Sequence, residues 1–324
     1  MRRVVASLAA ALLASAGLAA CGGSGAEPDA STEATLVLDF QPNAVHSGIY
    51  AALRDGDYRD RGLDLTVREP SASTDAPKLL EAGRVQFAVM DIHDLGLARE
   101  RGLDVVGVVP LVQKPLASVL ARSDEIQRPR DLEGKQVGVT GLPSDDAVLD
   151  SVVEADGGDP AKVDRVTIGF NAVAALAAGK IEAATGFWNA EGVTLIDQGT
   201  PVREFRVDDY GAPSYPELVI ATSRALIDSD PSLIEAMVSG TANGYADTAD
   251  DPDGALEALL AEVPGLDRSE QTAQLDALMQ AHAFEPAGAL DRAVLEDWAR
   301  WDTEHGILKD PPDVSRAFLL SAQG

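Results

Sequence analysis

The side chains best suited to bind a small molecule form one short run near the start of the chain. Asp39, Phe40, Asn43 and His46 fall within eight residues, directly after the apolar stretch 35–38. An acid, an aromatic ring, an amide and an imidazole in one loop can stack on a flat ring and hydrogen-bond its edges. The pattern predicts a strand that ends in a binding loop for a small heteroaromatic solute.

Apolar runs of strand length alternate with helical patterns along the chain, and this alternation predicts an α/β fold. The expected strands are 35–38, 85–90, 105–112, 117–121, 136–140, 182–187 and 218–222. Beyond residue 232 the pattern becomes helical, and the expected helices are 233–242, 255–261, 270–280 and 291–304. Prolines at or near the starts of these helices agree with the first helical turn, which tolerates a missing N–H.

A nine-residue pattern occurs twice in the chain. Residues 80–88 and 176–184 share the order Leu-x-Ala-Gly-basic-β-branched-polar-x-Ala. Each copy is typical of a helix that ends on a glycine just before a buried strand. The repeat predicts two similar α/β lobes, although such junctions also arise by chance.

In both copies the strand runs into polar or aromatic residues. Asp91 and His93 follow the first strand, and Trp188, Asn189 and Glu191 follow the second. Ligands of open α/β sheets bind beyond the carboxyl ends of the strands. We therefore expect two lobes whose strand ends face each other across a binding cleft.

The first 21 residues have the three parts of an export signal. Arg2 and Arg3 form a basic start, 4–18 is apolar, and small residues lead to Cys21. The apolar run is too short and too rich in alanine for a membrane span. The pattern resembles a bacterial lipobox, which implies cleavage before Cys21 and a lipid on its sulfur; the alternative is an ordinary signal peptide with an incidental cysteine. Residues 22–33 are expected to form a flexible tether.

Length and charge narrow the class of protein. About 290 residues follow the tether, and this length suits two lobes better than one core. The formal net charge is −27, and loss of Arg2 and Arg3 with the signal would make it more negative. Such an excess of acid argues against binding to nucleic acid or to anionic membrane surfaces through bulk charge.

The sequence offers no arrangement that commits the chain to catalysis. It has no Ser-His-Asp order and no glycine-rich phosphate loop. Cys21 is the only cysteine, which excludes a disulfide within the chain and a cysteine-based metal site. Five residues are of metal-ligating type but lack a spacing such as His-Glu-x-x-His: Asp39, His46, Asp91, His93 and Asp94. We predict neither a metal nor a cofactor.

Residues 39–50 resemble the opening of a known family. Their pattern, Asp-Phe-x-Pro-Asn-x-x-His-x-Gly-Ile-Tyr, is similar to the Asp-Trp-x-Pro-Asn-x-x-His-x-Gly-Leu-Tyr opening of the thiamine-pyrimidine branch of the NMT1/THI5-like proteins. Phe40 stands where that opening has Trp. Four further segments are similar to segments of the family: 56–64, 131–139, 187–193 and 210–219. The resemblance covers roughly residues 35–305.

The family contains two kinds of protein. One is the extracytoplasmic receptor of ABC importers for hydroxymethylpyrimidine or formylaminopyrimidine. The other is a fungal enzyme that builds the pyrimidine from pyridoxal phosphate and histidine, and it implies a lysine near the opening motif and a cysteine-rich iron-binding segment. Here the first lysine is Lys78 and Cys21 stands alone. The resemblance therefore favours the receptor, which is not an enzyme.

The resemblance implies an architecture, the two-lobe periplasmic-binding-protein fold of type II. Lobe one would comprise 34–120 and 221–324, and lobe two would comprise 121–220. The chain would cross between them at 120–122 and 221–223. Lobes of this kind close around a solute by a hinge motion.

The implied function is that of the solute-binding component of an ABC importer, with a thiamine-pyrimidine precursor as the solute. The implied partners are an ABC permease and, through the lipid on Cys21, the extracytoplasmic face of the bacterial cell membrane; the protein is expected to be a monomer. Three alternatives stay open. They are a receptor for riboflavin, nitrate or an alkanesulfonate, a pyrimidine-synthesis enzyme, and a surface lipoprotein that binds a protein partner.

An aminopyrimidine offers two flat faces, ring-nitrogen acceptors and an exocyclic amine. Phe40, Trp188 and Tyr215 are the candidates to stack on its faces, and plain core packing is the alternative for Trp188. Glu191 is the candidate to accept from the amine or to share a proton with a ring nitrogen. Its alternative is an acid at a helix N-terminus, where the dipole favours negative charge. Asn189 adds an amide beside them.

The remaining candidates would bind the ring substituent. His46 and Asn43 can donate and accept there, and the alternative for His46 is a brace within its loop. Ser144 is expected to cap a helix that starts at Asp145 and faces the cleft. Asp145 and Asp146 make this helix start unsuitable for a phosphate, so we expect a neutral or cationic solute.

Overall fold

The computed structural model describes residues 31–71, 75–122 and 124–321. The predicted signal peptide with Cys21, and the predicted tether up to residue 30, lie outside these residues. Residues 31–324 form one compact unit. Its first strand already begins at Thr32, so the end of the predicted tether belongs to a sheet instead. None of the described helices is long and apolar enough to cross a membrane.

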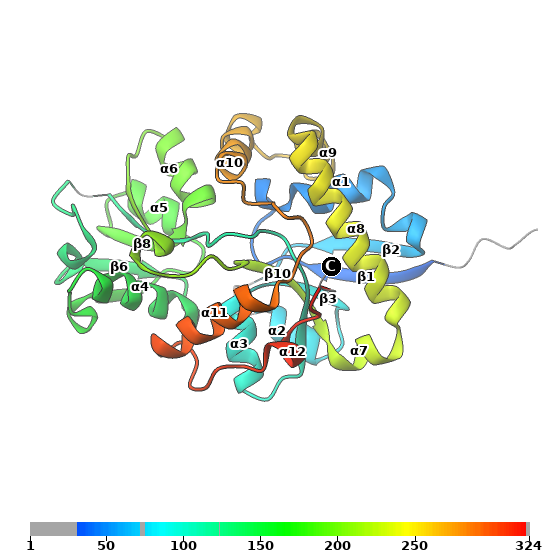
Figure 1. Ribbon diagram of the computed structural model, residues 1–324. Helices are drawn as coiled ribbons and strands as arrows, with labels where there is room; N and C mark the ends of the chain where they lie inside the picture. The colour runs from blue at the N-terminus through cyan, green and yellow to red at the C-terminus, as the bar shows by residue number, and fades with distance from the viewer. Residues whose placement is uncertain (1–30, 72–74, 123, 322–324) are drawn as a thin grey trace, which may run out of the picture. The chain divides into compact units, whose positions relative to one another are not determined.

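Five strands form the sheet of lobe one, in the order β2-β1-β3-β10-β4 (Figure 1). They are β1 (Thr32–Val37), β2 (Leu63–Arg68), β3 (Phe87–Asp91), β4 (Val105–Pro110) and β10 (Leu218–Ser223). β1, β2 and β3 are parallel, and β10 runs antiparallel between β3 and β4. Every residue of β4 is buried, as expected for a Val-rich strand that is covered on both faces.

The sheet of lobe two repeats this topology in the order β7-β6-β8-β5-β9. Its strands are β5 (Ala117–Ala121), β6 (Gln136–Val139), β7 (Asp164–Thr167), β8 (Ala183–Phe187) and β9 (Arg203–Arg206). β6, β7 and β8 are parallel, and β5 runs antiparallel to β8 and β9. The sequence pattern does not predict β2, β7 and β9, because each carries charged residues along its length.

The nine-residue repeat occupies the same place in both sheets. Helix α2 (Asp75–Glu81) leads to β3, helix α5 (Ala172–Ala177) leads to β8, and each strand lies in the middle of its sheet. The glycines of the two copies, Gly83 and Gly179, have φ values of 63° and 64°. Only glycine adopts this conformation freely, which explains why both copies carry it. The repeat thus marks two lobes of like topology.

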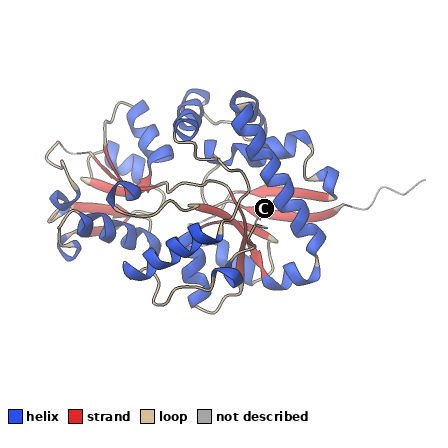
Figure 2. Ribbon diagram, in the orientation of Figure 1, coloured by secondary structure: helices blue, strands red, loops and turns tan. Residues whose placement is uncertain are grey.

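Helices cover the two sheets (Figure 2). Besides α2 and α5 they are α1 (Ser47–Asp55), α3 (Ile92–Glu100), α4 (Pro143–Ala155), α6 (Val193–Asp197), α7 (Arg224–Ser229), α8 (Pro231–Asp250), α9 (Pro252–Glu262), α10 (Arg268–Gln280), α11 (Arg292–Glu304) and α12 (Val314–Ala317). Helices α8 to α11 confirm the four helices predicted beyond residue 232. Each begins after an aspartate that accepts from a backbone N–H of the first turn: Asp230, Asp251, Asp267 and Asp291.

Helix α1 follows the predicted binding loop and packs closely on α8. A Cβ atom on Gly244 would lie 2.0 Å from the carbonyl oxygen of Gly48, so the two helices can approach this closely only with glycine there. The neighbouring Tyr245 donates its hydroxyl hydrogen to the carbonyl of Val45 at 2.7 Å. Helix α8 therefore fixes the position of the loop.

The two crossings between the lobes differ from the predicted ones. Strand β5 belongs to lobe two and β10 belongs to lobe one, so the chain crosses at 111–116 and again at 207–217. The predicted lobe boundaries near 120 and 221 are therefore wrong by a few residues. The reason is that an apolar run predicts a strand but does not show which sheet the strand joins.

A buried carboxylate connects the two crossings. Glu217 is fully buried, and its Oε2 accepts from the backbone N–H groups of Leu116 and Ala117 at 2.6 and 2.9 Å. One crossing is therefore held against the other by two hydrogen bonds to a single side chain.

Candidate functional site

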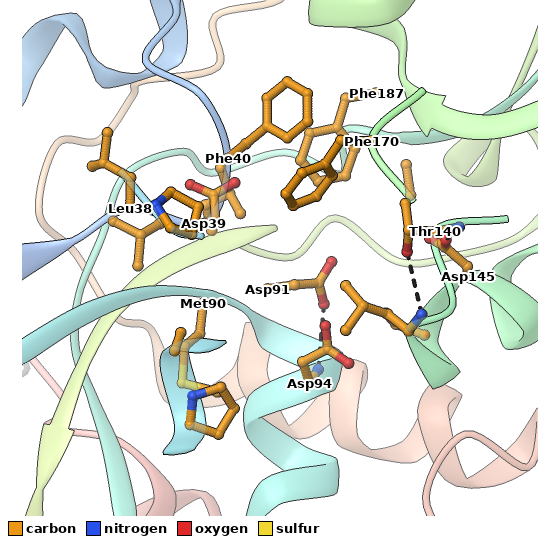
Figure 3. A pocket seen from close by; sticks show the side chains of 18 of the residues that line it. Leu38, Asp39, Phe40, Met90, Asp91, Asp94, Thr140, Asp145, Phe170 and Phe187 are labelled. Carbon is orange, nitrogen blue, oxygen red and sulfur yellow. Dashed lines mark hydrogen bonds between the residues drawn. The ribbon is translucent and has the colours of Figure 1, made fainter. Parts of the chain in front are cut away.

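A cavity of about 420 Å³ lies between the carboxyl ends of the parallel strands of the two lobes. Asp39 and Phe40 follow β1, and Asp91 ends β3; from lobe two come Thr140 after β6 and Phe187 at the end of β8. Figure 3 shows these side chains around one space. Cavities of this size bind small organic ligands. The predicted cleft between strand ends is thus present.

Aromatic rings from both lobes meet at the cavity. Phe40 of lobe one and Phe170 of lobe two lie edge to face, with ring centroids 4.6 Å apart at 90° (Figure 3). Phe187 lines the cavity on the lobe-two side. The stacking role predicted for Phe40 is compatible with this position. Phe170 was not predicted as a site residue, because the strand before it, β7, has no clear apolar pattern. The only sequence signal for a loop at this position is Gly169 directly before it.

His46 braces the binding loop and does not line the cavity. It is fully buried; its Nδ1 accepts from the N–H of Asn43 at 3.2 Å, so its Nε2 carries the proton and donates to Asp39 at 2.9 Å. Asn43 lines the cavity, but its side-chain oxygen accepts from the N–H of Val45. The brace alternative for His46 therefore holds, and its effect is to aim the Asp39 carboxylate into the cavity.

Glu191 lines the cavity from lobe two. It lies in a π-helical turn, Trp188–Gly192, and its Oε2 accepts from the N–H of Phe187 at 3.0 Å. Burial raises the pKa of Glu191, and the charges of Asp145 and Asp39 raise it further. A carboxyl group of this kind can accept from an amine or hold a proton toward a ring nitrogen.

Three further acids line the cavity: Asp91 and Asp94 lie below the aromatic rings in Figure 3, and Asp145 lies to the right, beside Thr140. Burial raises the pKa of Asp91 well above its ordinary range, and the charge of Glu217 raises it further. Burial likewise raises the pKa of Asp94 well above its ordinary range, and the charge of Asp91 raises it further. Burial also raises the pKa of Asp145, whose carboxylate accepts from the N–H of Thr140 at 2.6 Å. The cavity therefore has a strongly acidic wall.

Ser144 lines the cavity but does not cap a helix. Helix α4 begins at Pro143, two residues earlier than predicted, and its N-cap residue Leu142 makes no side-chain cap. The hydroxyl of Ser144 lies near the carboxyl group of Asp94 on α3 and lowers the pKa of that group, against the larger effect of burial. Ser144 of lobe two thus lies near an acid of lobe one beside the cavity.

A buried polar network lies behind Asp91. Asp91 itself caps helix α3 by accepting from the N–H of His93 at 2.8 Å. The two ring nitrogens of His93 contact Asp302 at 2.9 Å and the hydroxyl of Tyr215 at 3.0 Å. Burial lowers the pKa of His93, but the charges of Asp302, Asp91 and Glu217 outweigh burial and raise it to about 10.

Asp91, His93 and Glu217 are the one group of potential metal ligands within the described residues. Their ligand atoms lie within 4.8 Å of one another. Both nitrogens of His93 already have partners, and one oxygen of Glu217 holds the crossing at residues 116 and 117. We therefore assign the group to the internal network of the protein.

Besides His46, three further predicted site residues lie outside the cavity. Trp188 is buried; its indole N–H donates to the carbonyl of Pro115 at 3.0 Å, and Arg206 stacks on its ring at 4.2 Å. Its alternative, core packing, is what the structure shows. Asn189 is fully buried and does not line the cavity. Tyr215 is also fully buried, and its hydroxyl group is hydrogen-bonded to Nε2 of His93. Phe170 and Phe187 line the cavity where Trp188 and Tyr215 were expected to do so.

Comparisons with known proteins agree with this geometry. Residues 43–255 match the family described as NMT1/THI5 like. The chain is 32% identical to a formylaminopyrimidine-binding protein of Halalkalibacterium halodurans, over 95% of this chain and 96% of that protein. It is 26% identical to a 4-amino-5-hydroxymethyl-2-methylpyrimidine phosphate synthase of Legionella pneumophila, over 72% and 74% of the two chains.

The fold matches solved structures of solute-binding proteins. The alkanesulfonate-binding protein SsuA from Xanthomonas axonopodis pv. citri, solved with MOPS, superimposes with a TM-score of 0.70 at 21% identity, over 91% of this chain and all of that one (100%). The predicted two-lobe periplasmic-binding-protein fold is confirmed, and so is the solute-binding role. The chain belongs to the NMT1/THI5-like family.

Proposed function

We propose that the chain is the extracytoplasmic solute-binding component of an ABC importer and that its solute is an aminopyrimidine precursor of thiamine. One observation carries the proposal: the Phe40–Phe170 pair and the carboxyl group of Glu191 line the same cavity between the lobes. The formylaminopyrimidine-binding relative supports the ligand class.

The cavity supplies the contacts that such a ring needs. Phe40, Phe170 and Phe187 offer apolar surface to its faces, and each stacked pair contributes about 0.5–1.5 kcal/mol beyond area burial. Glu191 accepts from the exocyclic amine, and its raised pKa suits a proton shared with a ring nitrogen. Asp39, aimed by His46, is a second acceptor at the opposite wall.

We propose a receptor and not a synthase. The pyrimidine-phosphate synthases of the family are relatives too, so the distinction needs its own experiment. Incubation of the purified protein with pyridoxal phosphate should yield no pyrimidine product by mass spectrometry. Detection of such a product would overturn this part of the proposal.

We also propose that the protein is a monomer anchored by a lipid on Cys21 and delivers its solute to a permease. The support is the lipobox pattern before Cys21 in the sequence. Cys21→Ser should move the protein out of the membrane fraction or block its processing. A variant that matures and fractionates like the wild type would contradict the anchor.

Calorimetry tests the ligand. The protein should bind hydroxymethylpyrimidine or formylaminopyrimidine more tightly than riboflavin, nitrate or taurine, and mass spectrometry of ligand extracted after purification should find a pyrimidine. Tight binding of an anion, with no binding of a pyrimidine, would refute the proposal.

A further inference from the structure

We infer that helix α10 is a reversible latch between the lobes, and that Thr194 and Gln274, which form its contact, are positioning residues for solute binding. Neither residue lines the cavity, so each acts on the solute through the groups that it holds in place. The inference rests on the proposed function, because a latch matters only if the lobes close around a solute.

Helix α10 belongs to lobe one but packs on elements of both lobes. In lobe one it contacts α9 and the 3₁₀ turn Ala44–His46, and in lobe two it contacts α6 and the π-helical turn Trp188–Gly192. Figure 1 shows α10 between α6 and α9. The first turn contains His46, which holds Asp39, and the second contains Glu191. One helix therefore touches both turns that position carboxyl groups at the cavity.

The contact between α10 and lobe two is made by side-chain hydrogen bonds. Thr194 lies on α6, three residues after Glu191, and is buried. Its hydroxyl group donates to Oε1 of Glu270 at 2.7 Å and accepts from Nε2 of Gln274 at 3.1 Å. Because Glu270 and Gln274 both lie on α10, this one hydroxyl group joins lobe two to lobe one next to the turn that carries Glu191.

The buried residues of α10 differ in character. Leu275 and Leu278 join the main apolar core of lobe one, whereas Gln271 and Gln274 are buried polar residues, and Gln274 faces lobe two. Contacts between parts of a chain that move relative to one another are more polar than permanent cores, because water must solvate each side when they part. The polar character of this contact indicates that it opens.

Three buried amide side chains support the same interpretation. Asn189 lies in the π-helical turn that packs on α10, and neither its side-chain nitrogen nor its oxygen has a hydrogen-bond partner among the described residues. The same holds for Oε1 of Gln271 and of Gln274. Burial of polar groups without partners is unfavourable, whereas water can satisfy them once the lobes part. The latch alone is therefore weak, and it closes when the solute adds its own contacts.

Binding kinetics with hydroxymethylpyrimidine test the latch. Thr194→Val keeps the shape of the side chain but removes its hydroxyl group. It should raise both Kd and the dissociation rate about two- to tenfold, as expected for the net loss of a hydrogen bond. Thr194→Ser, which retains the hydroxyl group, should restore wild-type binding. Gln274→Met should act like Thr194→Val, and the double variant should bind no more weakly than either, because all three break the same contact.

A hydrogen bond within lobe one provides the matched control. Thr241 on α8 is fully buried, and its hydroxyl group is hydrogen-bonded to that of Tyr58 at 2.9 Å. Thr241→Val should lower the melting temperature and leave Kd and the dissociation rate unchanged. If Thr194→Val and Gln274→Met also change only the melting temperature, or if Thr194→Ser binds as weakly as Thr194→Val, the latch is refuted.

A cross-link tests the opening of the latch without a ligand. Thr194→Cys and Gln274→Cys, combined with Cys21→Ser, leave one pair of thiols that a short bismaleimide should join. Small-angle scattering of the ligand-free protein should then give a smaller radius of gyration after joining than before. Failure to join, or equal radii, would overturn the latch. If hydroxymethylpyrimidine does not bind the wild type, the proposed ligand falls, and this comparison still decides whether the latch opens.

Discussion

The edge-to-face pair of Phe40 and Phe170 should act as a contact between the lobes that strengthens ligand binding. One ring comes from the loop after β1 and the other from the loop after β7, so the contact exists only while the lobes are together. If ligand binding draws the lobes together, the pair contributes to the binding free energy. Either single change to alanine should then lower affinity.

A double-mutant cycle isolates the pair from other effects of each ring. At a centroid distance of 4.6 Å and 90° the rings have favourable geometry, and such pairs are worth about 0.5–1.5 kcal/mol beyond area burial. Phe40→Ala, Phe170→Ala and the double variant should therefore show a coupling in Kd of roughly two- to tenfold. Calorimetry with the tightest pyrimidine ligand measures all four values.

A pair within a single lobe provides the control. Phe205 on β9 and Tyr210, in the segment directly after β9 that packs on α4 and β5 of the same lobe, meet edge to face at 6.1 Å and 89°. Tyr210→Ala should lower the melting temperature and leave Kd unchanged. If the Phe40–Phe170 coupling is zero within error while both single variants bind weakly, each ring contacts the ligand on its own. The reasoning that the pair closes the site would then be wrong.

Three further changes test the site and the network behind it. Glu191→Gln should weaken pyrimidine binding by roughly 1.5–3 kcal/mol, about tenfold or more, with little change in melting temperature; unchanged affinity would remove Glu191 from the site. Trp188→Phe should cost about 1 kcal/mol of unfolding free energy, because the carbonyl of Pro115 loses its donor, and an altered Kd would instead place Trp188 in the site. His93 has its pKa raised to about 10, so its stabilising effect is complete below its unfolded pKa of about 6.5 and is lost as pH rises toward 10. Denaturant titrations should show unfolding free energy falling across this range, and His93→Gln should flatten the slope; an equal slope in both proteins would contradict the role of His93.

The parts of the site that are close in sequence could be predicted from it. The brace of Asp39 by His46 spans seven residues of one loop, and the repeat around Gly83 and Gly179 marks helix–strand junctions that are entirely local. Local sequence patterns predict backbone turns and hydrogen bonds between residues close in sequence, because a few neighbouring residues determine them. The strand ends that line the cavity followed from the same patterns.

The direction in which a side chain points after a strand could not be predicted in the same way. Trp188 and Glu191 lie three residues apart in one π-helical turn, yet Glu191 lines the cavity and Trp188 packs under Arg206. An extra residue in a helical turn changes the direction in which the following side chains point. The sequence Trp-Asn-Ala-Glu-Gly does not reveal this change. The prediction assigned both residues to the ligand because both follow the end of the same strand.

Contacts between distant segments account for the rest. Ser144 was predicted to cap its own helix, but helix α4 begins at Pro143, so Ser144 lies within the first turn, and its hydroxyl lies near Asp94, fifty residues earlier and in the other lobe. A hydroxyl group caps a helix from the position before its first residue, because there its oxygen can accept from the free N–H groups of the first turn. Ser144 lies past that position, so its surroundings are set by the neighbour that it meets across the cavity. Which neighbour it meets depends on how the lobes pack and not on the sequence around either residue.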